Sequence, residues 1–222
     1  MISLWRVRST FLFLTKKASP VIRNSSSIRV FPQVSLVDEP VATVIEGLTP
    51  GKPVHLHLQV TNQCNLHFSS LTEYLSSNRG DLDLATAIPF GHGEADPMLP
   101  FWSLKPEPDS DSRFCSSQAD DPYCCKYQVV DKDTLQVLAE TDFQRLIMGP
   151  GVRRIPVKEG RLRGTLFLPP GEGPFPAVMK FYGGLHQKNV IEDKAAVLAS
   201  RGYACFVMAY FGIEGLPKTY VE

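Results

Sequence analysis

Several features that would assign this chain to a membrane, secreted or metal-dependent class are missing from its sequence. No stretch approaches the ~18–20 consecutive apolar residues of a membrane-spanning helix, and the longest candidate, Tyr203 to Phe211, has nine. The five cysteines are an odd number without a CxxC pair, which indicates reduced thiols rather than a disulfide framework. His55 and His57 alternate with leucines, as on one face of a strand, and have no cysteine or carboxylate at ligand spacing. We therefore expect no membrane span, no metal and no cofactor.

Acidic side chains are missing from the start of the chain. The first is Asp38, whereas residues 1–30 contain six basic side chains. The formal net charge of the whole chain is zero, so the remainder carries 17 basic against 23 acidic side chains. Nucleic-acid binding depends on the neutralisation of phosphates by Lys and Arg. This acidic balance gives no electrostatic basis for nucleic-acid binding, and any anionic ligand must be met by a local basic cluster.

The basic stretch at residues 1–30 has the composition of a mitochondrial transit peptide. It contains serines and no acid, and Trp5 together with Phe11–Leu14 can supply an apolar face. A secretory signal would need an apolar region of about 7–15 residues, but Lys16 and Lys17 follow Phe11–Leu14 closely. We predict import into the mitochondrial matrix. A tail without targeting value, or secretion, are the alternative interpretations, and the cytosol or the peroxisome are the alternative locations.

The middle of the chain shows the pattern of a β-sandwich. Residues Val54–Val60 alternate between apolar and polar side chains, which predicts a half-buried strand. Further strands are predicted from the apolar patterns and the turns between them, at Ala42–Leu48, Leu66–Leu75, Tyr127–Val130 and Thr134–Met148. Several short strands at this spacing are typical of a sandwich, here over residues 36–148. Residues 89–122 are rich in Pro, Ser, Asp and Gly and predict a long irregular loop.

After Gly149 the pattern changes to that of an α/β domain. The predicted elements, in order, are a hairpin of Arg153–Val157 and Arg161–Leu168, a strand at Pro176–Tyr182, a helix and a strand at Tyr203–Phe211. Asn189 and Glu192 have the spacing of a capping box and predict the helix start. A strand, helix and strand in succession form a βαβ unit with a parallel sheet. We therefore predict a second domain over residues 149–222.

Four motifs in this second region resemble one known family. They are the runs Gly149–Arg154, Arg161–Pro176, Ala199–Tyr210 and Gly215–Pro217, joined upstream by Asp38–Pro40 and Gly47–Pro50. In combination they look like the domain junction of the acyl-CoA thioesterase and bile-acid-CoA:amino acid N-acyltransferase family. The resemblance covers residues from about 35 to 222.

The resemblance implies an immunoglobulin-like sandwich followed by an α/β-hydrolase domain. Family members hydrolyse the thioester of a fatty acyl-CoA, or transfer the acyl group to glycine or taurine. Both reactions use a Ser or Cys nucleophile in a Gly-x-Ser-x-Gly or Gly-x-Cys-x-Gly turn, followed by an acid and a histidine. No Ser or Cys of this sequence stands between glycines at that spacing. The resemblance therefore predicts that the nucleophile, acid and base lie beyond Glu222. Three functions stay open: a thioesterase, an N-acyltransferase, and a truncated, non-catalytic binding module.

One catalytic element is expected within the chain. The loop after the third strand of an α/β-hydrolase supplies a backbone N–H to the oxyanion hole, and Gly184 and Leu185 occupy that place. A plain glycine turn is the alternative interpretation. His186 is adjacent, but the fold places its catalytic base near the end of the domain, so we expect an exposed loop histidine.

Two expectations concern partners. A basic cluster could contact the phosphates of an acyl-CoA substrate or could line solvated hairpin faces; it comprises Arg153, Arg154, Lys158, Arg161 and Arg163. The apolar strand Tyr203–Phe211 should be central in a complete sheet. With no further strand in the chain, we expect one of its edges to stay open and to permit self-association.

Overall fold

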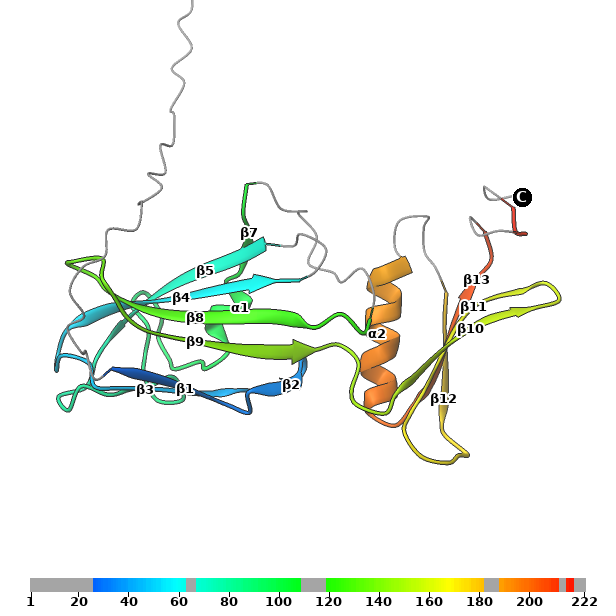
Figure 1. Ribbon diagram of the computed structural model, residues 1–222, viewed down its shortest axis with the longest axis horizontal. Helices are drawn as coiled ribbons and strands as arrows, with labels where there is room; N and C mark the ends of the chain where they lie inside the picture. Colours follow the sequence, from blue (N-terminus) through cyan, green and yellow to red (C-terminus); the bar gives the residue numbers. More distant parts are fainter. Residues whose placement is uncertain (1–25, 63–66, 109–118, 182–187, 212–214, 218–222) are drawn as a thin grey trace, which may run out of the picture.

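The computed structural model describes residues 26–62, 67–108, 119–181, 188–211 and 215–217, with no description of the side chains of residues 188–190. The first nine strands form two sheets that pack face to face, which we call the two-sheet unit (Figure 1). The smaller sheet has the order β1-β3-β6, with β1 at Ser27–Phe31, β3 at Ala42–Glu46 and β6 at Leu82–Asp83. The larger has the order β2-β9-β8-β4-β5-β7, with bounds Val34–Leu36 (β2), Pro53–Thr61 (β4), His67–Leu75 (β5), Lys105–Pro106 (β7), Tyr123–Asp131 (β8) and Val137–Leu146 (β9).

The core of the two-sheet unit lies between these sheets. Leu56 and Leu58 of β4 and Tyr127 of β8 are fully buried, and Ile45 of β3 faces them from the smaller sheet. His55 and His57 occupy the alternate, partly exposed positions of β4. The alternation that the sequence showed at residues 54–60 therefore does separate a buried face from a solvated one. The chain is confirmed to be β-rich in this part.

Two predicted boundaries in the two-sheet unit are wrong. Strand β1 begins at Ser27, inside the predicted leader, because Ile28 and Val30 are buried and the strand pairs with β3. Residues 89–122 are less irregular than expected, since they contain β7 and the short helix α1 at Leu99–Trp102. A proline at the start of α1 fits a first helical turn, where the missing N–H has no helical acceptor.

The C-terminal sheet has four strands in the order β10-β11-β13-β12. Their bounds are Arg153–Glu159 (β10), Leu162–Leu168 (β11), Ala177–Phe181 (β12) and Ala204–Ala209 (β13). Strands β12 and β13 are parallel and are joined by helix α2 at Lys188–Ser200, which confirms the predicted hairpin and βαβ unit. The helix ends at Ser200 and is followed by Gly202, whose φ is +92°, and the N–H of Tyr203 donates to the carbonyl of Leu198.

One expectation about this part of the chain is wrong and another stays open. The predicted capping box stays a prediction, because the side chain of Asn189 lies outside the description, but the carboxylate of Glu192 also has partners in β10 and β11, as described below. The predicted open edge of residues 203–211 is wrong, since β13 pairs with β11 on one side and with β12 on the other. The crossover through α2 places β12 outside β13. In the part of the chain that the structure describes, the free edges belong to β10 and β12.

Helix α2 lies between the C-terminal sheet and the two-sheet unit (Figure 1). It presents the fully buried Ala195, Ala196 and Ala199, whose small side chains let the helix approach Phe167 and Val207 of the sheet. On the other sheet face, Met179 and Phe181 of β12 are more than half exposed. No helix within the described ranges is long and apolar enough to span a membrane.

Candidate functional site

The carboxyl ends of β12 and β13 lie at one edge of the C-terminal sheet. The register pairs Phe181 with Met208, so the connections that follow the two parallel strands both leave from this edge. Ligands of open α/β sheets bind at the carboxyl ends of their strands. Gly184, Leu185 and His186 belong to residues 182–187, which lie outside the described residues. Their roles therefore stay predictions, although the strand and the helix on either side of them are in place.

Aromatic side chains border this edge. The rings of Phe181 and Tyr210 meet edge to face with 6.4 Å between their centroids, and Tyr210 contacts Phe211 at 4.7 Å. Phe181 comes from β12 and the other two follow β13 directly. Phe181 and Tyr210 are both partly exposed, so this aromatic group forms an apolar surface at the carboxyl edge of the sheet.

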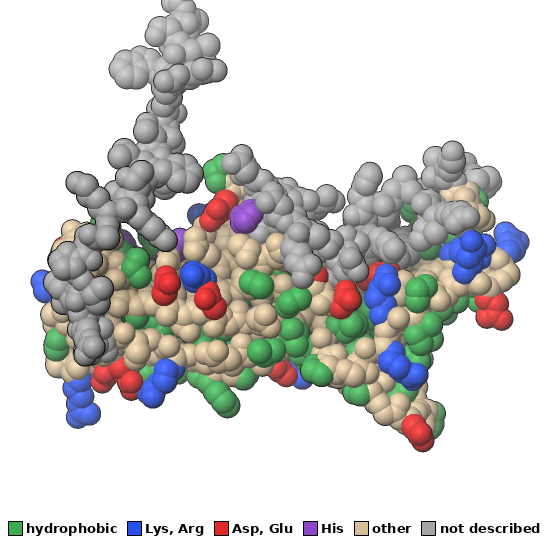
Figure 2. Space-filling model, in the orientation of Figure 1, with side chains coloured by type: hydrophobic (Ala, Val, Ile, Leu, Met, Phe, Trp, Pro, Cys, Tyr) green, Lys and Arg blue, Asp and Glu red, His purple; other side chains and the backbone are tan. Residues whose placement is uncertain are grey.

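The basic cluster predicted from the sequence is divided by the structure. Arg163 pairs with Ala209 at the end of β13, and Lys158 pairs with Arg163, so these two and Arg161 lie at the carboxyl edge. Figure 2 shows Lys and Arg side chains gathered over this end of the β10–β11 hairpin. Arg153 and Arg154 lie at the opposite end of the hairpin. Three of the five residues are therefore placed near the candidate site and two are not.

Arg154 belongs to a buried polar cluster under α2. Its Nε and Nη2 donate to Oε2 of Glu192 at 3.1 and 2.7 Å, and the hydroxyl of Thr165 donates to Oε1 at 2.8 Å. Glu192 is only 3% exposed, so its charge depends on these donors. The cluster ties α2 to β10 and β11. It thereby holds the helix that begins directly after residues 182–187.

We expect Glu192→Ala to lower the free energy of unfolding by about 2–3 kcal/mol. That is less than the roughly 3–5 kcal/mol for breaking a fully buried ion pair, because Arg154 is partly exposed and can regain water. Urea unfolding measures the change. Glu159→Ala, at the exposed end of β10 in the same hairpin, is the control and should change stability by less than about 0.5 kcal/mol. Equal effects of the two substitutions would contradict the role given to Glu192.

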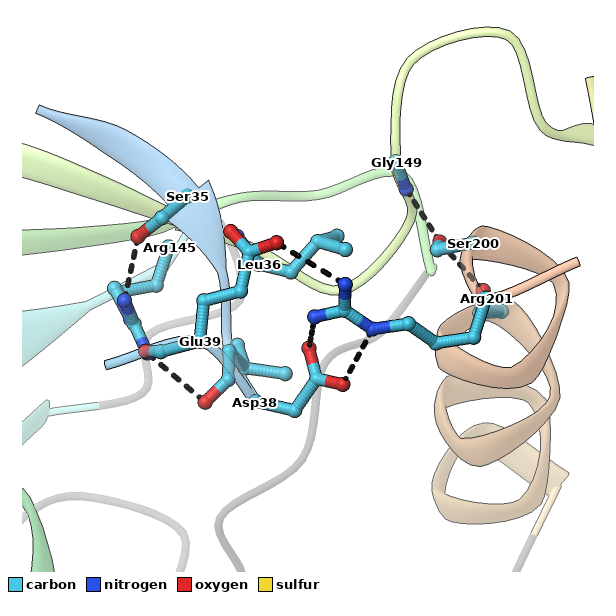
Figure 3. A network of polar contacts seen from close by, with 10 residues as sticks. Ser35, Leu36, Asp38, Glu39, Arg145, Gly149, Ser200 and Arg201 are labelled. Atoms are coloured by element: carbon cyan, nitrogen blue, oxygen red, sulfur yellow. Dashed lines mark hydrogen bonds and ion pairs between the residues drawn. The ribbon is translucent and has the colours of Figure 1, made fainter. Parts of the chain in front are cut away.

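A second set of contacts joins α2 to the two-sheet unit (Figure 3). Arg201, directly after α2, donates to both carboxylate oxygens of Asp38 at 2.8 and 2.9 Å and contacts Glu39 at 3.2 Å. The hydroxyl of Ser200 accepts from the N–H of Gly149 at 2.8 Å. Hydrogen bonding to Arg201 holds the pKa of Asp38 below its ordinary value of 3.8. The contact is therefore complete at neutral pH and is lost only when acid protonates Asp38.

The described thiols do not have the properties of a nucleophile. Burial raises the pKa of Cys125 to about 12 and also raises that of Cys205, so both stay protonated at neutral pH. Cys124 is exposed on β8, in the other unit from the carboxyl edge of β12 and β13. Within the described ranges, no three His, Cys, Asp or Glu side chains gather as metal ligands would. Among the described residues, the carboxyl edge of β12 and β13 therefore offers cationic side chains but no thiol suited to nucleophilic attack.

Comparison with known proteins identifies relatives of the chain. Residues 38–159 match the family model described as the acyl-CoA thioester hydrolase/BAAT N-terminal region. Acyl-coenzyme A thioesterase 6 of Mus musculus is 36% identical over 186 residues, which cover 82% of this chain and 44% of that protein. The mitochondrial acyl-coenzyme A thioesterase 2 of Homo sapiens is 34% identical over 232 residues, covering 97% and 47%. The peroxisomal succinyl-coenzyme A thioesterase of Mus musculus is 35% identical, covering 82% and 44%. The chain spans about half the length of the curated relatives it matches.

Proposed function

Because the chain belongs to the acyl-CoA thioester hydrolase/BAAT family, we propose that it is part of an enzyme that hydrolyses fatty acyl-CoA thioesters. The match over residues 38–159 carries this proposal, together with relatives named as thioesterases that align with 82–97% of the chain. Transfer of the acyl group to an amino acid is the alternative within the family. The relatives described above are all named for hydrolysis, which favours the thioesterase.

In this proposal the two-sheet unit is an immunoglobulin-like domain over about residues 36–148, extended at its start by β1 and β2. Residues 149–222 are the opening part of an α/β-hydrolase domain. The mixed sheet, in which a hairpin precedes a parallel βαβ unit, supports this assignment. Gly184 and Leu185 would donate backbone N–H groups to the thioester oxygen, where each such donor contributes on the order of 10²–10³ in rate. The reaction needs no cofactor, since CoA is part of the substrate.

The nucleophile in the proposed mechanism follows a further strand of the hydrolase sheet, which this sequence does not contain. The test is to sequence transcripts past the codon of Glu222 and to express the frame that follows. An open frame that encodes a Gly-x-Ser-x-Gly turn, with a product that releases CoA from palmitoyl-CoA, would support the thioesterase. A Cys in place of the Ser would favour the acyltransferase. A stop codon directly after Glu222 in every transcript would overturn the proposal in favour of a non-catalytic binding module.

The basic residues at the carboxyl edge are proposed to meet the phosphates of CoA. In an active extended protein, Arg161→Glu should raise KM for palmitoyl-CoA roughly fivefold, equivalent to about 1 kcal/mol for an exposed ion pair, with kcat unchanged. Arg153→Glu is the matched control, because it makes the same charge change at the far end of the same hairpin. A KM that responds equally to both substitutions would indicate only a loss of overall positive charge.

The relatives include one named as mitochondrial and one named as peroxisomal. We propose the mitochondrion for this chain, because of its basic, acid-free start. The leader must end before Ser27, where β1 begins. Residues 1–26 fused to a fluorescent reporter should therefore co-localise with a mitochondrial stain. Diffuse cytosolic signal from this fusion would contradict the assignment.

A further inference from the structure

The two-sheet unit contains a hollow of about 310 Å³ that the proposed thioester chemistry does not use. It lies beside α1, and most of its lining is apolar. Phe68, Met98, Phe101, Trp102 and Leu104 form one part of the wall, and Arg145 of β9 supplies the cation. We call this hollow the Arg145 pocket. A mostly apolar cavity with one fixed polar group is the usual form of a small-molecule site.

Arg145 is buried without a carboxylate partner. It is 3% exposed, and its guanidinium donates to the hydroxyl of Ser35 and to the carbonyls of Val37 and Glu39. All three acceptors are neutral. Among the described residues no carboxylate lies within ion-pair distance of Arg145, and those of Asp38 and Glu39 contact Arg201 instead (Figure 3). Its Nε–H and one N–H of Nη1 have no acceptor among these residues.

The surroundings of Arg145 favour a bound anion. Burial lowers the pKa of Arg145, which reflects the cost of removing its charge from water. The ring of Phe101 lies 5.3 Å from the guanidinium carbon and offsets part of that cost. An anion placed against the two unused N–H groups would offset more of it, because charge-assisted hydrogen bonds are stronger than those to neutral acceptors. The rest of the wall is mostly apolar, so an anion that carries an apolar chain fits it better than a small hydrated ion.

We propose that the Arg145 pocket binds a medium-chain fatty acid, with its carboxylate at Arg145 and its chain along Phe101, Trp102 and Leu104. At roughly 30 Å³ per non-hydrogen atom, the hollow holds about ten such atoms, so most of decanoate, which has ten carbons and two oxygens, fits within it. Each buried methylene contributes about 0.8 kcal/mol, so the chain supplies most of the affinity and Arg145 supplies the selection for an anion. The proposal does not depend on the proposed catalytic function.

Trp102 provides a direct readout of binding. The sequence has two tryptophans, Trp5 and Trp102, so Trp5→Phe leaves Trp102 at the pocket as the single emitter. Decanoate, kept below its critical micelle concentration, should change this emission saturably. Decanol and decyltrimethylammonium, which have the same chain without the negative charge, should bind at least tenfold more weakly. Equal binding of all three, or no saturable change with decanoate, would overturn the proposal.

Two variants test the pocket itself. Arg145→Gln should remove the preference for decanoate over decanol, but loss of its contacts to residues 35–39 could also unfold the protein. Leu104→Glu leaves those contacts in place and puts a negative charge in the pocket, so it should weaken decanoate binding at least tenfold. Leu71→Glu, on the outward face of β5, is the matched control. Circular dichroism checks that each variant is folded. Unchanged decanoate binding by folded Leu104→Glu would overturn the proposal.

Discussion

The purified 222-residue chain is expected to release CoA from palmitoyl-CoA no faster than buffer does. Its sequence contains no nucleophile turn, and burial keeps the thiols of Cys125 and Cys205 protonated. In a serine hydrolase, loss of the nucleophile or of the histidine removes on the order of 10⁶-fold in rate. Any binding and oxyanion effects that remain are too small to replace this loss. A thiol reagent that reports free CoA measures the rate.

The positive control for that assay is the mitochondrial acyl-coenzyme A thioesterase 2 of Homo sapiens, which is 34% identical and named for this reaction. A weak rate from the 222-residue chain is enzymatic only if boiling the protein abolishes it and repeated purification does not. Hydrolysis that a single Ser or Cys substitution within residues 1–222 abolishes would contradict our account of the site. It would mean that the nucleophile lies on an element that lacks the expected turn.

The second large effect concerns association. A fragment of residues 26–148 should be monomeric, because both sheets of the two-sheet unit enclose one core. A fragment of residues 26–222 should elute as oligomers or aggregate. Strand β12 has no neighbour on its outer edge within the described residues, and Met179 and Phe181 expose apolar surface there. Unpaired apolar strand edges are templates for pairing with another chain. Size-exclusion chromatography with light scattering distinguishes the two outcomes.

Charged substitutions identify which surface associates. Met179→Lys together with Phe181→Lys should return most of the longer fragment to the monomer, since lysine on an edge strand opposes pairing. Leu71→Lys is the control, because Leu71 is equally apolar and exposed but lies on β5. If the unsubstituted fragment of residues 26–222 is monomeric and unfolds cooperatively, the outer edge of β12 does not cause association. The assignment of residues 149–222 to a hydrolase sheet would then need revision.

Local patterns in the sequence were sufficient to predict the secondary structure of most of the chain. The period of two at residues 54–60, the hairpin before Leu168 and the βαβ unit after it all appear in the structure. Each of these signals comes from residues close together in sequence, whose side chains face one core. The resemblance to the thioesterase family rested on similar local runs, and the match over residues 38–159 confirmed it.

The failed predictions involve residues whose partners are distant in sequence. The predicted leader over residues 1–30 is too long, since the burial of Ile28 depends on pairing with β3. The capping-box spacing of Glu192 likewise gives no sign that its carboxylate binds Arg154, 38 residues away, and Thr165, 27 residues away. A buried carboxylate needs a cation, and the sequence does not show which one it will meet.

The sequence by itself determined the β-rich first part, the βαβ unit and the family, because periodicity and local motifs are properties of neighbouring residues. Only the tertiary structure decided the strand order that pairs both edges of β13, and only it divided the basic cluster between two ends of a hairpin. It also decided the pocket in which Arg145 meets Phe101. Strand order and pockets depend on which distant segments pack together. Many arrangements share one pattern of polar and apolar residues, and burial of the whole core selects among them.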